Sequence, residues 1–190
     1  MKIYEVYPEY EKYDICIVDT EAECTGCNLD NYDPMFHFDG SSKAAGWQPR
    51  TLIRSKNKIA MGDYVSCLEG GVMILEENAA AKLEAVMGRV EKLPLNCNFG
   101  DYLAINIMDV LACIDYGNSK FLLASEESTD GRPNIMYFEK YAFLKEKLNG
   151  FHAFKIVDDR ESSIFVDETF VESVAAQGVT GFKFELVWQD

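Results

Sequence analysis

The chain is organised around residues 62–95, which read GDYVSCLEGGVMILEENAAAKLEAVMGRVEKLPL. Gly70-Gly71 separates two apolar runs and predicts a hairpin turn, because glycine reaches positive φ at little cost. Four apolar residues after the turn share one helical face: Ala79, Leu83, Val86 and Met87. This spacing predicts a helix, and Glu76 and Glu77 stand at its N-terminus, where the helix dipole favours negative charge. The unit is therefore predicted to be strand, turn, strand, helix, strand.

The same order of elements is predicted a second time, about ninety residues later, between Phe154 and Trp188, with Asp167 as the N-cap of its helix. Chance use of a common supersecondary pattern explains the recurrence as well as duplication does. A further helix is predicted over residues 139–148, where Tyr141, Leu144 and Leu148 share a face. We therefore predict an α+β fold, mainly antiparallel or mixed β-sheet with about three packed helices, with two similar units as an open alternative.

Composition and charge restrict the class of protein. The 190 residues are 48% hydrophobic and 13% aromatic, which is enough for a real core. The net charge of −14 disfavours binding to nucleic acid, and it suits either a basic partner or simply solubility. Residues 1–40 hold ten acidic residues against two lysines, whereas residues 41–60 hold five basic residues and no acidic one. We expect these stretches to pack together, with a basic binding patch as the alternative.

Residues 1–40 are accordingly predicted to be acidic N-terminal strands and a loop within the same domain as residues 41–190. The N-terminal sequence has no secretory signal pattern, and no apolar run approaches the ~18 residues of a membrane span. Two of the six cysteines, Cys67 and Cys113, lie inside apolar strand patterns. Free thiols in a reducing cytoplasm are therefore expected, rather than a disulfide framework.

Cys24-Thr25-Gly26-Cys27 is the one motif that resembles a chemical site. A redox pair of this type should open a helix, but the sequence that follows is rich in turn residues, and nearby negative charge raises a thiol pKa. A zinc site would need two more ligands, for which Cys16 and His37 are the nearby candidates. Metal binding or thiol redox chemistry at Cys24 and Cys27 is the alternative function, and an incidental pair is the preferred interpretation.

No catalytic constellation is recognisable elsewhere in the sequence. The two histidines, His37 and His152, have no glycine-flanked serine nucleophile to serve, and Gly70-Gly71 lacks the residues of a phosphate-binding loop. We therefore predict neither an enzyme nor a cofactor. A further alternative is a structural or oligomeric module, such as a homodimer in which the alternating C-terminal strand pairs across a twofold axis.

The best surface candidate for protein binding is the aromatic and acidic stretch over residues 32–40. Exposed aromatic side chains flanked by carboxylates are a common means of gripping a basic partner. The candidate partner-binding residues are Asp33, Phe36, Asp39 and Trp47. The alternative is a loop that places Phe36 and Phe38 in the core.

Several short landmarks occur in a fixed order between residues 40 and 188. They are Trp47-Gln48-Pro49, Gly62-Asp63-Tyr64, the Val72–Leu75 strand with its acid-capped helix, Leu93-Pro94-Leu95, Asp101-Tyr102-Leu103-Ala104-Ile105-Asn106, Ile114-Asp115 with Ser119, Ile164-Phe165-Val166-Asp167 and Gly178-Val179-Thr180-Gly181-Phe182. This set resembles immunity family eleven, a myxobacterial-type family of bacterial polymorphic-toxin systems that was earlier a domain of unknown function.

The resemblance implies a cytoplasmic bacterial protein, encoded beside a toxin, that binds and neutralises that toxin. It brings no catalytic motif, and no interface residue can be carried over because the binding surfaces of immunity proteins vary. The acidic charge of the chain favours a basic toxin, such as a nuclease. The segment that holds Cys24 and Cys27 lies outside the resemblance.

Overall fold

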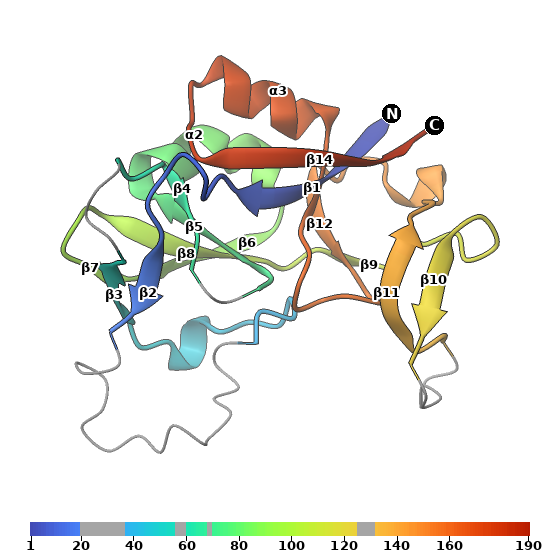
Figure 1. Ribbon diagram of the computed structural model, residues 1–190, viewed down its shortest axis with the longest axis horizontal. Coiled ribbons are helices and arrows are strands. Elements are labelled where there is room, and N and C mark those ends of the chain that lie inside the picture. The colour runs from blue at the N-terminus through green and yellow to red at the C-terminus, as the bar shows by residue number, and fades with distance from the viewer. Residues whose placement is uncertain (20–36, 56–59, 68–69, 125–131) are drawn as a thin grey trace.

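The computed structural model describes residues 1–19, 37–55, 60–67, 70–124 and 132–190. These residues form two larger β-sheets, two small ones and two α-helices (Figure 1). The two helices lie together on one side of the molecule, and a two-stranded ribbon lies at one end of it (Figure 1).

The first of the larger sheets has four strands and contains the hairpin predicted from residues 62–95. In spatial order its strands are β4 (Tyr64–Val65), β5 (Val72–Glu76), β8 (Tyr102–Ile107) and β6 (Val90–Pro94). All neighbours are antiparallel. β8 lies between β5 and β6 and is buried along most of its length, which agrees with a sequence that shows no clear outer face.

The second larger sheet brings together the two ends of the chain. In spatial order its strands are β14 (Phe182–Gln189), β1 (Lys2–Pro8), β13 (Phe165–Asp167), β12 (Ala153–Ile156) and β9 (Val110–Leu111). β9 and β12 are parallel, and the other neighbours are antiparallel. β1 therefore supplies an inner strand to a sheet that is otherwise built from residues 110–189.

The two α-helices begin where the sequence predicts them to begin. α2 (Glu77–Met87) follows β5, and α3 (Glu168–Ala176) follows β13. The carboxylate of Glu76 accepts from the backbone N–H of Ala79 at 3.0 Å, and that of Asp167 accepts from the N–H of Phe170 at 3.0 Å. Each acid thus satisfies a donor that the first turn of a helix leaves free, which stabilises the helix by about 1 kcal/mol.

The main core lies between the two larger sheets and the two helices. α2 and α3 pack against each other, and their apolar faces meet inward-facing residues of both sheets. The residues that carry this contact include Met73, Leu75, Leu83, Met87, Ile105, Ile107, Val166, Phe170 and Val174. Both sheets thereby share one continuous core.

A three-stranded sheet joins the N-terminal stretch to the basic one. Its strands are β2 (Cys16–Val18), β3 (Thr51–Arg54) and β7 (Asn96–Cys97). Asp14 is 2% exposed, and its carboxylate lies 3.1 and 3.2 Å from two guanidinium nitrogens of Arg54. The predicted packing of the basic stretch on the acidic one is therefore present at this ion pair.

The prediction of an α+β fold with about three helices is wrong. The chain is mostly β, and the described residues contain two α-helices, α2 and α3. The helix predicted over residues 139–148 is instead the end of β11 (Ile135–Lys140), an extended segment, and the short 3-10 helix η3 (Lys145–Lys147). Phe143 forms an isolated β-bridge with Ile114, so pairing with a residue distant in the sequence overrides a spacing that also fits a helix.

Candidate interaction surface

The predicted site residues fall in two groups. Cys24, Cys27, Asp33 and Phe36 lie outside the described residues. Asp39 and Trp47 lie within them, on either side of the short 3-10 helix η2 (Ala44–Gly46). The site can therefore be built from residues 37–47 and from the sheets against which they pack.

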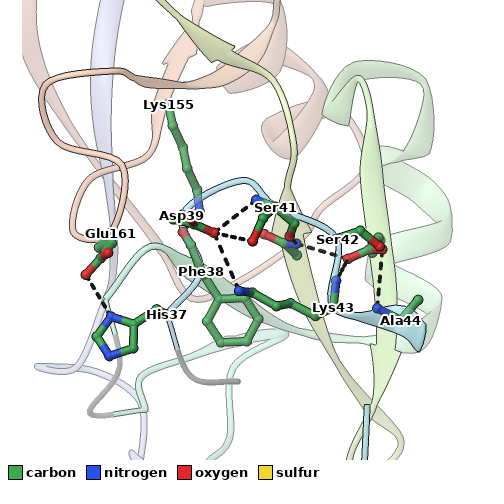
Figure 2. Close-up of polar contacts among 11 residues, drawn as sticks. His37, Phe38, Asp39, Ser41, Ser42, Lys43, Ala44, Lys155 and Glu161 are labelled. Carbon is green, nitrogen blue, oxygen red and sulfur yellow. Dashed lines mark hydrogen bonds and ion pairs between the residues drawn. The ribbon is translucent and has the colours of Figure 1, made fainter. Parts of the chain in front are cut away.

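Phe38 anchors this segment in the interior. Its side chain is 1% exposed and belongs to a core cluster with residues of β3, β5 and β8. Its backbone carbonyl accepts a hydrogen bond from the ammonium group of Lys155, on β12 (Figure 2). The alternative interpretation, a loop whose aromatic side chain lies in the core, is therefore correct for Phe38.

Lys155 is a fully buried lysine. It lies between two apolar residues of β12, a position at which a strand would normally expose a polar side chain to solvent. Burial lowers the pKa of its ammonium group to about 8, because removal from water disfavours the charged form. Asp39, Glu161 and Asp159 oppose this shift through their negative charge, whereas Lys43 adds to it. The lysine thus ties the 37–44 segment to the five-stranded sheet.

Asp39 is bonded to neighbouring residues of the same segment, so its carboxylate is not a free surface group. It accepts hydrogen bonds from the Ser41 backbone N–H at 3.0 Å and from the Ser41 hydroxyl at 2.5 Å, and the Lys43 ammonium lies 3.5 Å away (Figure 2). Burial acts to raise the pKa of Asp39, but these hydrogen bonds and the charge of Lys43 outweigh it and lower the pKa to about 2. Asp39 therefore carries a stable negative charge.

A second carboxylate, Glu91 on β6, fixes the next residues of the segment. It accepts from the Ser42 hydroxyl at 2.5 Å, the Lys43 backbone N–H at 2.8 Å and the Asn106 side-chain amide at 3.0 Å. Burial opposes the ionisation of Glu91, but the hydrogen bonds are stronger and lower its pKa. The 37–44 segment is thus bonded to both larger sheets, through Lys155 and through Glu91.

Trp47 is also engaged internally. Its indole N–H donates to the backbone carbonyl of Pro94 at 2.8 Å, and its ring centroid lies 6.1 Å from that of Phe38. The side chain is half-buried, so part of the ring remains accessible. A role for Asp39 or Trp47 in partner binding stays a prediction, and any partner would meet these residues as fixed features.

The two histidines pair with carboxylates at separate places. His37 Nδ1 lies 2.7 Å from Glu161, and His152 Nδ1 lies 2.9 Å from Asp167, the residue that caps α3. Among the residues that the structure describes, no cluster of histidine, cysteine or acidic side chains is arranged to hold a metal ion. These histidine pairs thus join neighbouring elements of the fold.

The sequence analysis missed a pair of strands that carries several exposed apolar side chains. Four large exposed residues are on β10 (Lys120–Leu123) and β11 (Ile135–Lys140): Leu122, Leu123, Met136 and Tyr137. These strands form a two-stranded antiparallel ribbon at one end of the molecule (Figure 1). The available signal was a pair of short apolar runs on either side of a polar stretch, which is typical of two paired strands. This signal was overlooked because residues from 139 onward were assigned to a helix.

A comparison with protein families identifies the C-terminal part of the chain. Residues 96–188 match the model of the immunity protein family Imm11. The resemblance inferred from the sequence is confirmed over this segment. A search of the curated proteins found no match.

The Imm11 match covers β7 to β14 and therefore the whole ribbon, Lys155 and α3. Asp39 and Trp47 lie before it. In the part of the chain that the structure describes, no helix is long and apolar enough to cross a membrane.

Among the described residues, Cys16, Cys67, Cys97 and Cys113 do not take part in disulfide bonds. A hydrogen bond with Cys67, together with burial, raises the pKa of Cys16. Burial raises the pKa of Cys97 to about 11 and that of Cys113 to about 12. Since the thiolate is the reactive form, these three thiols are poor nucleophiles at neutral pH.

We expect Cys97 to react about a hundredfold more slowly with iodoacetamide in the native chain than in urea at pH 8, because its thiolate fraction falls by about that factor. Pulsed alkylation followed by peptide mass spectrometry measures the rate at each cysteine. The urea-unfolded chain is the control. Equal rates at Cys97 in the two conditions would contradict the buried-thiol account.

Proposed function

We propose that the protein is an immunity protein that binds a cognate bacterial toxin and neutralises it by stoichiometric contact, without catalysis. The observation that carries this proposal is the Imm11 match over residues 96–188. The arrangement of residues 37–47 supports a role without catalysis, because the charged groups in and around this segment form hydrogen bonds that hold it in place. The site of action that we propose is the cytoplasm.

The charge of the chain supports a basic toxin as the partner. A net charge of −14 creates a negative potential that accelerates encounter with a positively charged protein and repels nucleic acid. Electrostatic steering of this kind weakens as salt screens it, over a Debye length of about 8 Å at physiological ionic strength. The association rate constant should therefore fall as salt is added.

The test is co-expression with the polypeptide encoded by the neighbouring toxin gene. We expect cells that make this chain to survive the toxin and the toxin to co-purify with the chain. The control is an unrelated acidic protein of similar size and charge, which should give neither survival nor co-purification. A toxin that kills equally in the presence of this chain, and that does not bind it, would overturn the proposal.

A further inference from the structure

Three cysteines from separate segments of the chain meet in one hydrophobic cluster. Cys16 begins β2, Cys67 follows β4, and Cys97 ends β7. Cys16 belongs to the buried part of this cluster, and Cys67 and Cys97 pack against it. Cys113 belongs to a different cluster. The described part of the chain thus brings cysteine side chains together at one place.

Two of these cysteines, Cys16 and Cys67, are in contact. The Cys16 backbone N–H donates to the carbonyl of Ser66 at 2.9 Å, and the Cys16 sulfur lies 3.2 Å from the same oxygen. This carbonyl belongs to the planar peptide bond that joins Ser66 to Cys67. The Cys16 thiol also shares a hydrogen bond with Cys67. Main-chain and side-chain contacts therefore hold the two sulfur atoms next to each other.

The surroundings of the two thiols give them different reactivity. Cys16 is 1% exposed, and its hydrogen bond with Cys67 and its burial raise its pKa, so it keeps its proton. Cys67 is partly exposed, so a small oxidant can reach it from solvent. A thiol that donates to a neighbouring sulfur also favours negative charge on that sulfur, and the thiolate is the form that reacts. The first oxidation is therefore expected at Cys67.

We propose that Cys16 and Cys67 form a redox-sensitive dithiol, which a hydroperoxide converts into a reversible disulfide between β2 and the segment after β4. In the first step the Cys67 sulfur attacks the peroxide, the O–O bond breaks, and Cys67 becomes a sulfenic acid as water or an alcohol leaves. In the second step the Cys16 sulfur attacks that of Cys67, the S–O bond breaks, and hydroxide leaves as water with the Cys16 proton. The two sulfur atoms lose two electrons, which the peroxide oxygens accept.

Proximity offsets the low nucleophilicity of Cys16 in the second step. Its sulfur already lies beside that of Cys67, so the attack is intramolecular and needs no encounter. A low-molecular-weight thiol reverses the bond by thiol–disulfide exchange at the more accessible sulfur, that of Cys67. Disulfides of reducing compartments are mostly transient bonds of this kind. The inference does not depend on toxin binding.

The test treats the purified full-length chain with dilute hydrogen peroxide near neutral pH, followed by alkylation and peptide mapping without reduction. We expect a linked pair of peptides that contains Cys16 and Cys67, and we expect dithiothreitol to separate it. Assignment of the linked peptides distinguishes this bond from one between Cys24 and Cys27. The disulfide closes a long loop, so the oxidised chain should have a Tm about 5–10 °C above that of the reduced chain.

Serine variants separate the roles of the two cysteines. Cys67→Ser should give no such linked peptide and no rise in Tm. Cys16→Ser should leave Cys67 as a sulfenic acid, which dimedone should label about fivefold more than in the wild type. Cys113→Ser alters a buried thiol of the other cluster and is the control, which should cross-link as the wild type does. Circular dichroism verifies the fold of each variant.

Three results would overturn the proposal. The first is a wild-type chain in which peroxide does not link Cys16 to Cys67, or links Cys67 to Cys97 instead. The second is unchanged dimedone labelling of Cys67 in Cys16→Ser, because Cys16 would then not react with the oxidised partner. The third is a linked chain whose Tm does not rise, because the bond would then distort the fold and contradict the contact between the two thiols.

Discussion

Gly181→Ala should lower the free energy of unfolding by about 4 kcal/mol, because the added methyl group would enter space already filled by backbone. Gly181 has a φ of +88°, and a Cβ built on it would lie 2.1 Å from the carbonyl oxygen of Tyr64 on β4. Next to it, the Thr180 carbonyl accepts from the Tyr64 backbone N–H at 3.0 Å. The turn before β14 therefore cannot move away without breaking its contact with the four-stranded sheet.

Gly178→Ala is the matched control for this prediction. Gly178 also has positive φ, +63°, but a Cβ there meets no atom within 4 Å. Its substitution should cost only the backbone strain, about 1–2 kcal/mol. Urea unfolding monitored by tryptophan fluorescence measures both variants. Equal losses of stability would show that the close approach to Tyr64 contributes nothing.

Relative to the variant Lys155→Met, the wild type should gain about 3 kcal/mol in its free energy of unfolding between pH 7.5 and pH 10.5. The pKa of Lys155 falls from 10.5 to about 8 in the folded chain. Between these values the folded lysine is neutral while the unfolded one still binds a proton, so raising the pH favours the folded wild type. The methionine variant keeps a side chain of similar shape but cannot titrate.

The quantity to measure is the stability of the wild type minus that of the variant across this pH range. Cys16, Cys97 and Cys113 have raised pKa values and act in the opposite direction, but both proteins contain them and the subtraction removes their effect. Lys183→Met, at an exposed position of β14, is the control and should give a flat difference. A flat difference for Lys155→Met as well would mean that its ammonium group is not desolvated.

Local signals in the sequence predicted the parts of the fold that depend on neighbouring residues. Both α-helices and their acidic caps, Glu76 and Asp167, were predicted because the capping bond joins residues three apart. The insertion of β1 between β13 and β14 pairs Ile3 with Asp167 and Trp188, and no local pattern reports a contact over that separation. The prediction of a third helix was wrong because a short apolar run can fit both the helical period and the strand period.

The candidate site was predictable to a smaller extent. The sequence directed attention to residues 32–47, and the structure shows that Asp39 and Trp47 are bonded within the protein. The bond from Lys155 to the Phe38 carbonyl could not be foreseen, because a lysine between two apolar residues of a strand is normally read as exposed. The exposed ribbon was missed because its second strand runs into the region that was assigned to a helix.

The most direct test of neutralisation by contact is a titration of the purified toxin with this chain, with residual toxin activity as the readout. At concentrations well above the Kd, activity should fall linearly and reach zero near one chain per toxin. Mass spectrometry of the mixture should recover both proteins chemically unchanged. Loss of activity at far less than one equivalent, or covalent alteration of the toxin, would contradict the account, and so would full activity in the presence of excess chain.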